Sequence, residues 1–172
     1  MRYIASAVPI DLVDKQAIGH VRLVATTPDG PIYENPSTLP RVMFATEGRQ
    51  ADFEVLLRTG QWPEFDPTAT VLLEAAPLVA TPARRRPGTV RILDYANTAV
   101  TIEADSPDGG WVVLNDIWQQ WWFASIDGTP APLLKANVLF RAVQVPSGRH
   151  TVTFRFQPLR GAWRQLLERF GR

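Results

Sequence analysis

The sequence has no cysteine, only two histidines among 172 residues, and almost no charge excess, with 18 Lys and Arg against 17 Asp and Glu. The lack of cysteine excludes disulfides, thiolate metal sites and a cysteine nucleophile. A formal net charge of +1 gives no overall attraction for nucleic acid, and the one basic run, Arg84 to Arg86, has no aromatic residues interleaved with it. We therefore expect no nucleic-acid partner.

Long apolar runs are also missing. A membrane-spanning helix needs about 20 apolar residues, whereas the best run, Val71 to Ala80, is interrupted by Glu74 and Pro77. The segment Met1 to Pro9 has too short an apolar core for a signal peptide. We therefore expect that the chain does not span a bilayer by itself.

Proline is abundant instead, because the 15 prolines are nearly twice the usual share of about 5%. This favours many short strands over long helices. Over residues 89–158, apolar residues alternate with polar ones, as at Val100 and Ile102, and turns such as Asp127-Gly128 separate the segments. The pattern predicts an antiparallel β-sandwich over residues 89–158.

The alternation also predicts which side chains form the core of this sandwich. Residues two apart in a strand lie on one face of the sheet. One continuous apolar core is therefore expected from Val100, Ile102, Trp111, Val113, Phe140, Phe154 and Phe156.

Residues 1–80 show both strand-like and helix-like spacing of apolar residues. Strand-like segments bounded by Pro, Gly, Asp or Asn surround one helical segment, Ala51 to Arg58, in which Phe53, Leu56 and Leu57 lie at i, i+3 and i+4. This predicts a small α+β subdomain over residues 1–80. The whole chain is therefore expected to be mainly β, and α+β overall.

Two further segments complete the expected organisation. Residues 81–88 hold two prolines, three adjacent arginines and Gly88, which is typical of a solvated linker. Residues 159–172 predict a short amphipathic C-terminal helix. Its apolar stripe consists of Trp163, Leu166, Leu167 and Phe170. Such a helix suits either packing on the domain or a membrane interface.

The most unusual motif is the segment Asn115 to Phe123, which is rich in aromatic and amide side chains. Its three tryptophans cannot all face one core from a single strand, so at least one ring is expected near the surface. Flat rings beside polar groups suit sugar binding, because rings cover C–H faces while the polar groups bond hydroxyls. An exposed ring equally suits contact with another protein. The candidate ligand-binding residues are Asn115, Asp116, Trp118, Gln119, Gln120 and Trp121.

The remaining polar residues form no catalytic or metal-binding constellation. His20 and His150 are far apart and lack a nearby glutamate at ligand spacing, and His150 starts a strand after a Pro-Ser-Gly turn. Asp108 and Asp127 each precede a glycine at a hairpin position, which favours turn formation over calcium binding. No glycine-rich loop precedes a helix. We expect no catalytic residue, metal or cofactor in this chain.

Several motifs follow one another at particular spacings along most of residues 1–158. They are Tyr33-Glu-Asn-Pro36, Leu39-Pro-Arg41, Val90 to Asp105, Gly110 to Asp116, Trp122, Ile126-Asp-Gly128, Lys135-Ala-Asn137, Phe140 to Val143, Val145 to Gly148 and His150 to Phe154. Together they resemble the C-terminal extracytoplasmic region of the YfhO family, which are polytopic bacterial membrane proteins similar to lipid-sugar-dependent glycosyltransferases. The segment Trp118 to Trp122 departs from the family, which usually has a Tyr-Pro-Gly-like turn just before its tryptophan.

The resemblance implies a position in the cell envelope, on the extracytoplasmic side of the membrane. In such enzymes the acidic catalytic residues are expected in loops of the membrane-spanning part. This chain is then a non-catalytic accessory or interaction module, whose partner is a membrane-embedded protein or the remainder of its own parent protein, with a glycan as a further candidate ligand. The alternatives are a stand-alone carbohydrate-binding protein and, with least support from the residues, an enzyme in its own right.

Overall fold

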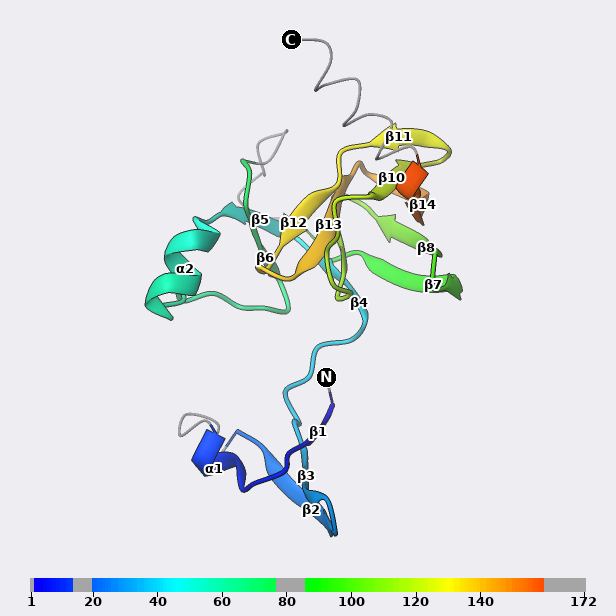
Figure 1. The fold of residues 1–172 in the computed structure, drawn as a ribbon. Helices are drawn as coiled ribbons and strands as arrows, with labels where there is room; N and C mark the ends of the chain where they lie inside the picture. Colours follow the sequence, from blue (N-terminus) through cyan, green and yellow to red (C-terminus); the bar gives the residue numbers. More distant parts are fainter. Residues whose placement is uncertain (1, 14–19, 77–85, 160–172) are drawn as a thin grey trace. The chain divides into compact units, whose positions relative to one another are not determined.

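The computed structural model describes residues 2–13, 20–76 and 86–159, and it is mainly β (Figure 1). Contacts divide the chain into two compact units, Met1–Pro40 and Arg41–Arg172. We call these the N-terminal unit and the sandwich unit. The helix expected over 159–172 lies outside the described residues, apart from Leu159. Residues 81–85 of the expected linker also lie outside them.

The N-terminal unit is a three-stranded antiparallel sheet with one short helix. Its strands are β1 (Tyr3–Ala5), β2 (Arg22–Thr27) and β3 (Gly30–Glu34), in the order β1-β3-β2, and the helix is α1 (Ile10–Val13). Gly30 has a φ of 130°, and a Cβ there would lie 2.1 Å from the carbonyl oxygen of Ser6. Only glycine fits this close approach. The Ile10 amide donates to the buried Tyr33 hydroxyl (3.1 Å), which ties α1 to the sheet.

The sandwich unit contains two sheets that share a core. The five-stranded sheet is antiparallel and has the order β11-β10-β14-β8-β7. Its strands are β7 (Thr89–Ala96), β8 (Ala99–Ser106), β10 (Trp122–Ile126), β11 (Thr129–Ala131) and β14 (Gly148–Phe156).

The six-stranded sheet has the order β4-β9-β13-β12-β6-β5. Its strands are β4 (Val42–Ala45), β5 (Glu47–Gln50), β6 (Thr70–Leu73), β9 (Gly110–Leu114), β12 (Leu134–Ala136) and β13 (Phe140–Val145). Its ladders are antiparallel except for the parallel pair β5 and β6, and these two strands are connected through α2 (Phe53–Thr59). The Asp52 side chain caps α2 by accepting from the Val55 amide (3.0 Å).

The unit boundary differs from the one expected at residues 81–88. Strands β4 and β6, which were expected in a first subdomain, pair with β9 and β12 of the sandwich. The contact boundary therefore lies between Pro40 and Arg41. Periodicity identifies a strand but does not identify its partner, so the pairing of β4 and β6 with distant strands is invisible in the local pattern.

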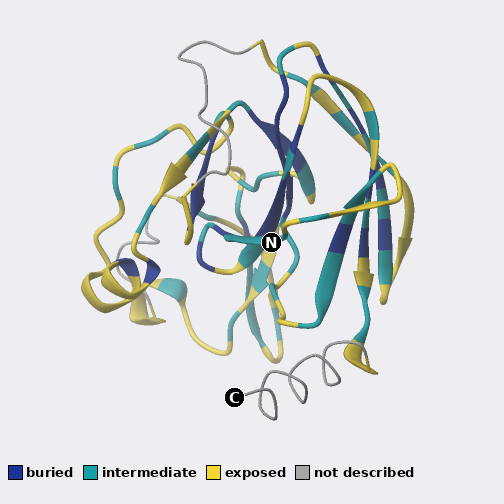
Figure 2. Cartoon of the chain, turned by 90° about the horizontal axis from the view of Figure 1, so that it is seen from above, coloured by how far each residue is buried: buried dark blue, intermediate teal, exposed yellow. Residues whose placement is uncertain are grey.

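The core lies between the two sheets, and Figure 2 shows buried residues concentrated along the strands. Members from both sheets include Val100, Ile102, Val143, Val152 and Phe154, all almost fully buried. This confirms the sandwich-like arrangement of the two sheets.

Strand β9 corrects one part of the expected core. Val112 and Leu114 face the core between the sheets, whereas Trp111 and Val113 alternate with them and lie on the opposite face. That face is buried as well, because Trp111 packs over Gly48, where an added Cβ would lie 2.6 Å from the indole nitrogen. A second cluster, Phe53, Leu56, Leu72 and Val138, attaches α2 to the unit. Leu57, expected on the same helical stripe, is exposed.

Among the described residues, no helix has the length and apolar character needed to cross a bilayer.

Replacement of Phe154 by alanine tests the core. Phe154 is fully buried between the sheets, so Phe154→Ala is expected to lower the free energy of unfolding by about 3–5 kcal/mol. The matched control Leu57→Ala removes an exposed side chain and should change it by less than about 0.5 kcal/mol. Urea unfolding of both variants measures this, and a loss below about 1 kcal/mol for Phe154→Ala contradicts the described core.

Candidate functional site at one end of the sandwich

Asp116, just after β9, is the centre of a charged cluster. The Tyr95 hydroxyl donates to Asp116 Oδ2 (2.9 Å), Arg41 Nε lies 3.4 Å from Oδ1, and Arg141 Nη2 lies 3.9 Å from Oδ2. Tyr95 belongs to the five-stranded sheet, whereas Arg41, Asp116 and Arg141 belong to or flank strands of the six-stranded sheet. The carboxylate therefore connects the two sheets at this end of the sandwich.

Arg141 is the most deeply buried charge of the cluster, at 3% exposure. It shares a face of β13 with the core residues Val143 and Val145. Burial lowers the pKa of the Arg141 guanidinium, and the Asp116 carboxylate partly offsets this effect. The guanidinium also lies over the Trp122 ring, with Cζ 3.8 Å from the centroid, so a cation–π contact helps to replace lost hydration.

Arg41 and Tyr95 cover the outer side of the cluster. The Arg41 guanidinium lies 4.6 Å from the centre of the Tyr95 ring. Burial, followed by the hydrogen bond to Asp116, raises the pKa of the Tyr95 hydroxyl. The phenol therefore stays protonated and keeps donating to Asp116 near neutral pH. Because Asp116 already faces one hydroxyl and two guanidinium groups, it acts as a structural acceptor.

Two of the candidate residues from the sequence, Trp118 and Trp121, contact different strands of the unit. Trp118 lies near Lys135 of β12, whose ammonium is 5.9 Å from the ring, whereas Trp121 packs against Phe156 of β14 at 6.3 Å between centroids. These two strands belong to different sheets.

The remaining candidates have separate positions. The Asn115 amide donates to the Arg41 carbonyl (2.8 Å) and continues the ladder between β4 and β9, while the Gln119 carbonyl accepts from the Trp122 amide (3.3 Å). The side chains of Gln119 and Gln120 are exposed.

An exposed apolar patch lies next to the charged cluster. Ile117 is 71% exposed and Leu139 is 57% exposed. The half-buried Trp118 joins them, because its amide donates to the Leu139 carbonyl (2.7 Å). We call Ile117, Trp118 and Leu139 the Ile117 patch.

The turn that presents Leu139 is strained. Asn137 and Val138 have φ values of 45° and 70°, and the left-handed region is unusual for a β-branched residue such as Val138. The conformation buries Val138 with the α2 cluster. Two hydrogen bonds to Leu72 hold this conformation. The Asn137 backbone amide donates to the Leu72 carbonyl, and the Asn137 side-chain oxygen accepts from the Leu72 backbone amide (2.9 Å each). Strain of this kind costs about 1–3 kcal/mol per residue and concentrates at functional segments.

Another ion pair joins the turn at Asp127 to strand β14. His150 Nδ1 lies 2.7 Å from Asp127 Oδ2, and its Nε2 lies 3.1 Å from the Ser147 carbonyl. The Asp127 carboxylate raises the pKa of His150, and His150 in turn lowers the pKa of Asp127. Since both ring nitrogens face acceptors, the imidazolium form satisfies both contacts.

Within residues 2–13, 20–76 and 86–159, no group of three or more His, Asp or Glu side chains is placed to hold a metal ion. Comparisons with protein-family models, with curated proteins and with solved structures find no match.

The sequence identified Asp116 but missed the partners that define its role. Arg41, Tyr95 and Arg141 are far from it along the chain. One signal was present in the sequence. Arg141 lies two and four residues before Val143 and Val145, and therefore on the same face of the strand. A charge on an apolar face indicates a buried ion that needs a partner.

A double-mutant cycle tests the coupling between Asp116 and Arg141. Asp116→Asn leaves the buried guanidinium without its counter-ion and is expected to lower the free energy of unfolding by about 3–5 kcal/mol. Combining it with Arg141→Met should recover part of this loss, because the uncompensated charge is then absent. Glu103→Gln, which breaks the exposed pair with Arg91 (3.2 Å), is the control and should cost less than about 1 kcal/mol. Strict additivity of the first two changes contradicts the coupling.

The His150 pair predicts a pH-dependent stability. Because the folded-state pKa of His150 is raised, its contribution is complete below the unfolded-state value of about 6.5 and is lost as pH rises through the folded-state pKa. The stability difference between the native protein and His150→Gln should therefore be constant below about pH 6.5 and shrink as the pH rises above this value. Urea unfolding on both sides of this value measures the difference. A difference that is constant with pH rules out the proposed pairing.

Proposed function

We propose that the chain is a non-catalytic, extracytoplasmic interaction module of a YfhO-like membrane glycosyltransferase system, and that the Ile117 patch contacts its membrane-embedded partner. The observation that carries the proposal is the exposure of Ile117 and Leu139 beside the half-buried Trp118. Tryptophan surrounded by apolar residues is typical of the anchors that dominate protein interfaces.

The strained turn supports a binding role for this patch. Asn137 and Val138 are held in left-handed conformations by Leu72 and by the α2 cluster. The next residue, Leu139, is the one that points outward. A turn that is fixed before binding loses little conformational freedom on association, which favours affinity.

The contacts of two carboxylates in the sandwich unit support a non-catalytic role. A general acid or base must reach the proton that it transfers. Asp116 is engaged by Tyr95 and lies beside two arginines, and Asp127 accepts from the Thr151 amide (2.8 Å) while pairing with His150. Both carboxylates are committed to holding strands and turns together.

The competing proposal is a stand-alone carbohydrate-binding protein. The exposed amides of Gln119 and Gln120 next to Trp118 favour it, because amides bond sugar hydroxyls. The Trp118 and Trp121 rings contact strands of different sheets, since Trp118 lies near Lys135 of β12 and Trp121 packs on Phe156 of β14, and this disfavours a single aromatic platform.

Site-specific photo-crosslinking tests the proposal. A photoreactive amino acid at position 117 or 139, in the full chain incubated with membranes of the bacterium that encodes it, is expected to form an adduct that mass spectrometry identifies as a polytopic glycosyltransferase-like protein. The control position is Leu57, which is 67% exposed on α2 and should give at least about tenfold less adduct, as expected for a surface residue outside an interface.

Two outcomes overturn the proposal. One is equal labelling from positions 117, 139 and 57, or no adduct with a membrane protein. The other is a saturable change in tryptophan fluorescence on titration with soluble oligosaccharides that Trp118→Ala removes while thermal stability is retained. The second outcome supports the carbohydrate-binding alternative.

A further inference from the structure

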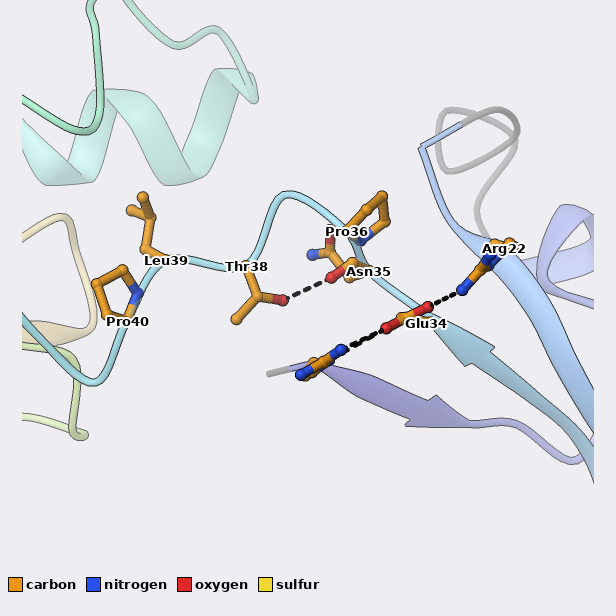
Figure 3. Close-up of a pocket in the computed structure, with 8 residues that line it drawn as sticks. Arg22, Glu34, Asn35, Pro36, Thr38, Leu39 and Pro40 are labelled. Atoms are coloured by element: carbon orange, nitrogen blue, oxygen red, sulfur yellow. Dashed lines mark hydrogen bonds and ion pairs between the residues drawn. The ribbon is translucent and has the colours of Figure 1, made fainter.

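A hollow of about 650 Å³ opens in the N-terminal unit, and none of the residues that line it is among the candidate site residues discussed above. Figure 3 shows Glu34 at its edge, with Arg22 on one side, and the segment from Asn35 to Pro40 running along it. Its lining combines charged, polar and apolar side chains: Arg2, Arg22, Glu34, Asn35, Pro36, Thr38, Leu39 and Pro40. The volume is that of a small-molecule site.

Glu34 positions two arginines at this hollow. It lies at the end of the central strand β3 and is 8% exposed, while Arg22 lies on β2 and Arg2 just before β1. Arg2 Nε and Nη2 bond Glu34 Oε1 (3.1 and 3.0 Å), and Arg22 Nη2 bonds Oε2. Each carboxylate oxygen therefore holds one guanidinium, and the two arginines lower the pKa of Glu34, so it stays ionised.

The arginines retain donors for a second anion. A guanidinium has five N–H groups in a rigid fork, so one edge can bond Glu34 while another bonds a ligand. The Arg22 side chain is 74% exposed, which leaves its remaining edges accessible from the hollow. Two positive charges against one negative charge leave the site with one positive charge in excess.

We infer that this hollow binds a small molecule through a carboxylate group. A carboxylate matches the planar guanidinium fork and supplies the single negative charge that the site lacks. A phosphate group carries about 1.5–2 negative charges near neutral pH and would oppose the neighbouring Glu34 carboxylate. Pro36, Leu39 and Pro40 supply an apolar wall for the remainder of the ligand, while Thr38, whose hydroxyl donates to the Asn35 carbonyl (2.9 Å), fixes the shape of that wall.

Calorimetric titration of the full chain tests the inference with matched pairs of probes. Glucuronate is compared with glucose, and acetyl-alanyl-alanine with its C-terminal amide, so that each pair differs in the carboxylate. At least one acid should bind at least about tenfold more tightly than its neutral counterpart, as expected for charge-assisted hydrogen bonds. The pair that responds identifies whether a sugar acid or a peptide terminus is the source. Binding of the acid should weaken as salt rises from about 0.01 M to about 1 M.

Variants locate the binding. Arg22→Gln should reduce the affinity for the responding acid at least about tenfold. Arg22→Lys keeps the charge but loses the guanidinium fork, so its affinity should lie between that of Arg22→Gln and that of the native protein. The control is Arg91→Gln, because Arg91 is similarly exposed, at 70% of its side chain, and is also paired with a carboxylate. Equal binding of acids and neutral probes, tighter binding of inorganic phosphate, or an equal effect of Arg91→Gln overturns the inference. None of these outcomes bears on crosslinking through the Ile117 patch.

Discussion

The sandwich unit depends on one buried positive charge. Arg141 enters the space between the sheets from β13, where its neighbours on the same face are valines. Its charge is tolerated because Asp116 lies 3.9 Å away and the Trp122 ring covers it at 3.8 Å. Asp116 in turn is held by Tyr95 and Arg41. Since Asp116 and Tyr95 come from different sheets, compensation of this single charge aligns the sheets at the end where the Ile117 patch is exposed.

Alternation along the chain predicted the sandwich well where one face of a strand is polar. Val100 and Ile102 of β8, and Phe154 of β14, lie in the core as expected, whereas Phe140 and Phe156 are only partly buried and are not among its buried members. The rule failed for β9, where all five residues are buried. With no polar face to mark the outside, the pattern does not reveal that Val112 and Leu114, and not Trp111 and Val113, meet the other sheet. The partners of β4 and β6 were missed for a related reason, since pairing over long sequence distances leaves no local trace.

The candidate site was predicted only in part, and the reason is again distance along the chain. The segment 115–121 was identified by its composition, and its two tryptophans, Trp118 and Trp121, are half-buried. Its roles are set by other elements: Lys135 approaches Trp118, Phe156 packs on Trp121, and Arg41 and Arg141 flank Asp116. The left-handed conformation of Val138 has no sequence signal, because it is imposed by the burial of that side chain with α2.

The order of the strands along the chain also shapes how the protein is made. Val42 of β4 pairs with Leu114, and Leu73 of β6 pairs with Ala136, so both strands are synthesised well before their partners. At about 5–20 residues per second, several seconds pass before β9 and β12 are made, and until then β4 has no partner strand and β6 has only β5. Val71, Leu72 and Leu73 are fully buried once the sheet is complete, which makes this run an aggregation-prone segment before β12 pairs with it. One edge of β6 therefore stays open until β12 has emerged from the ribosome.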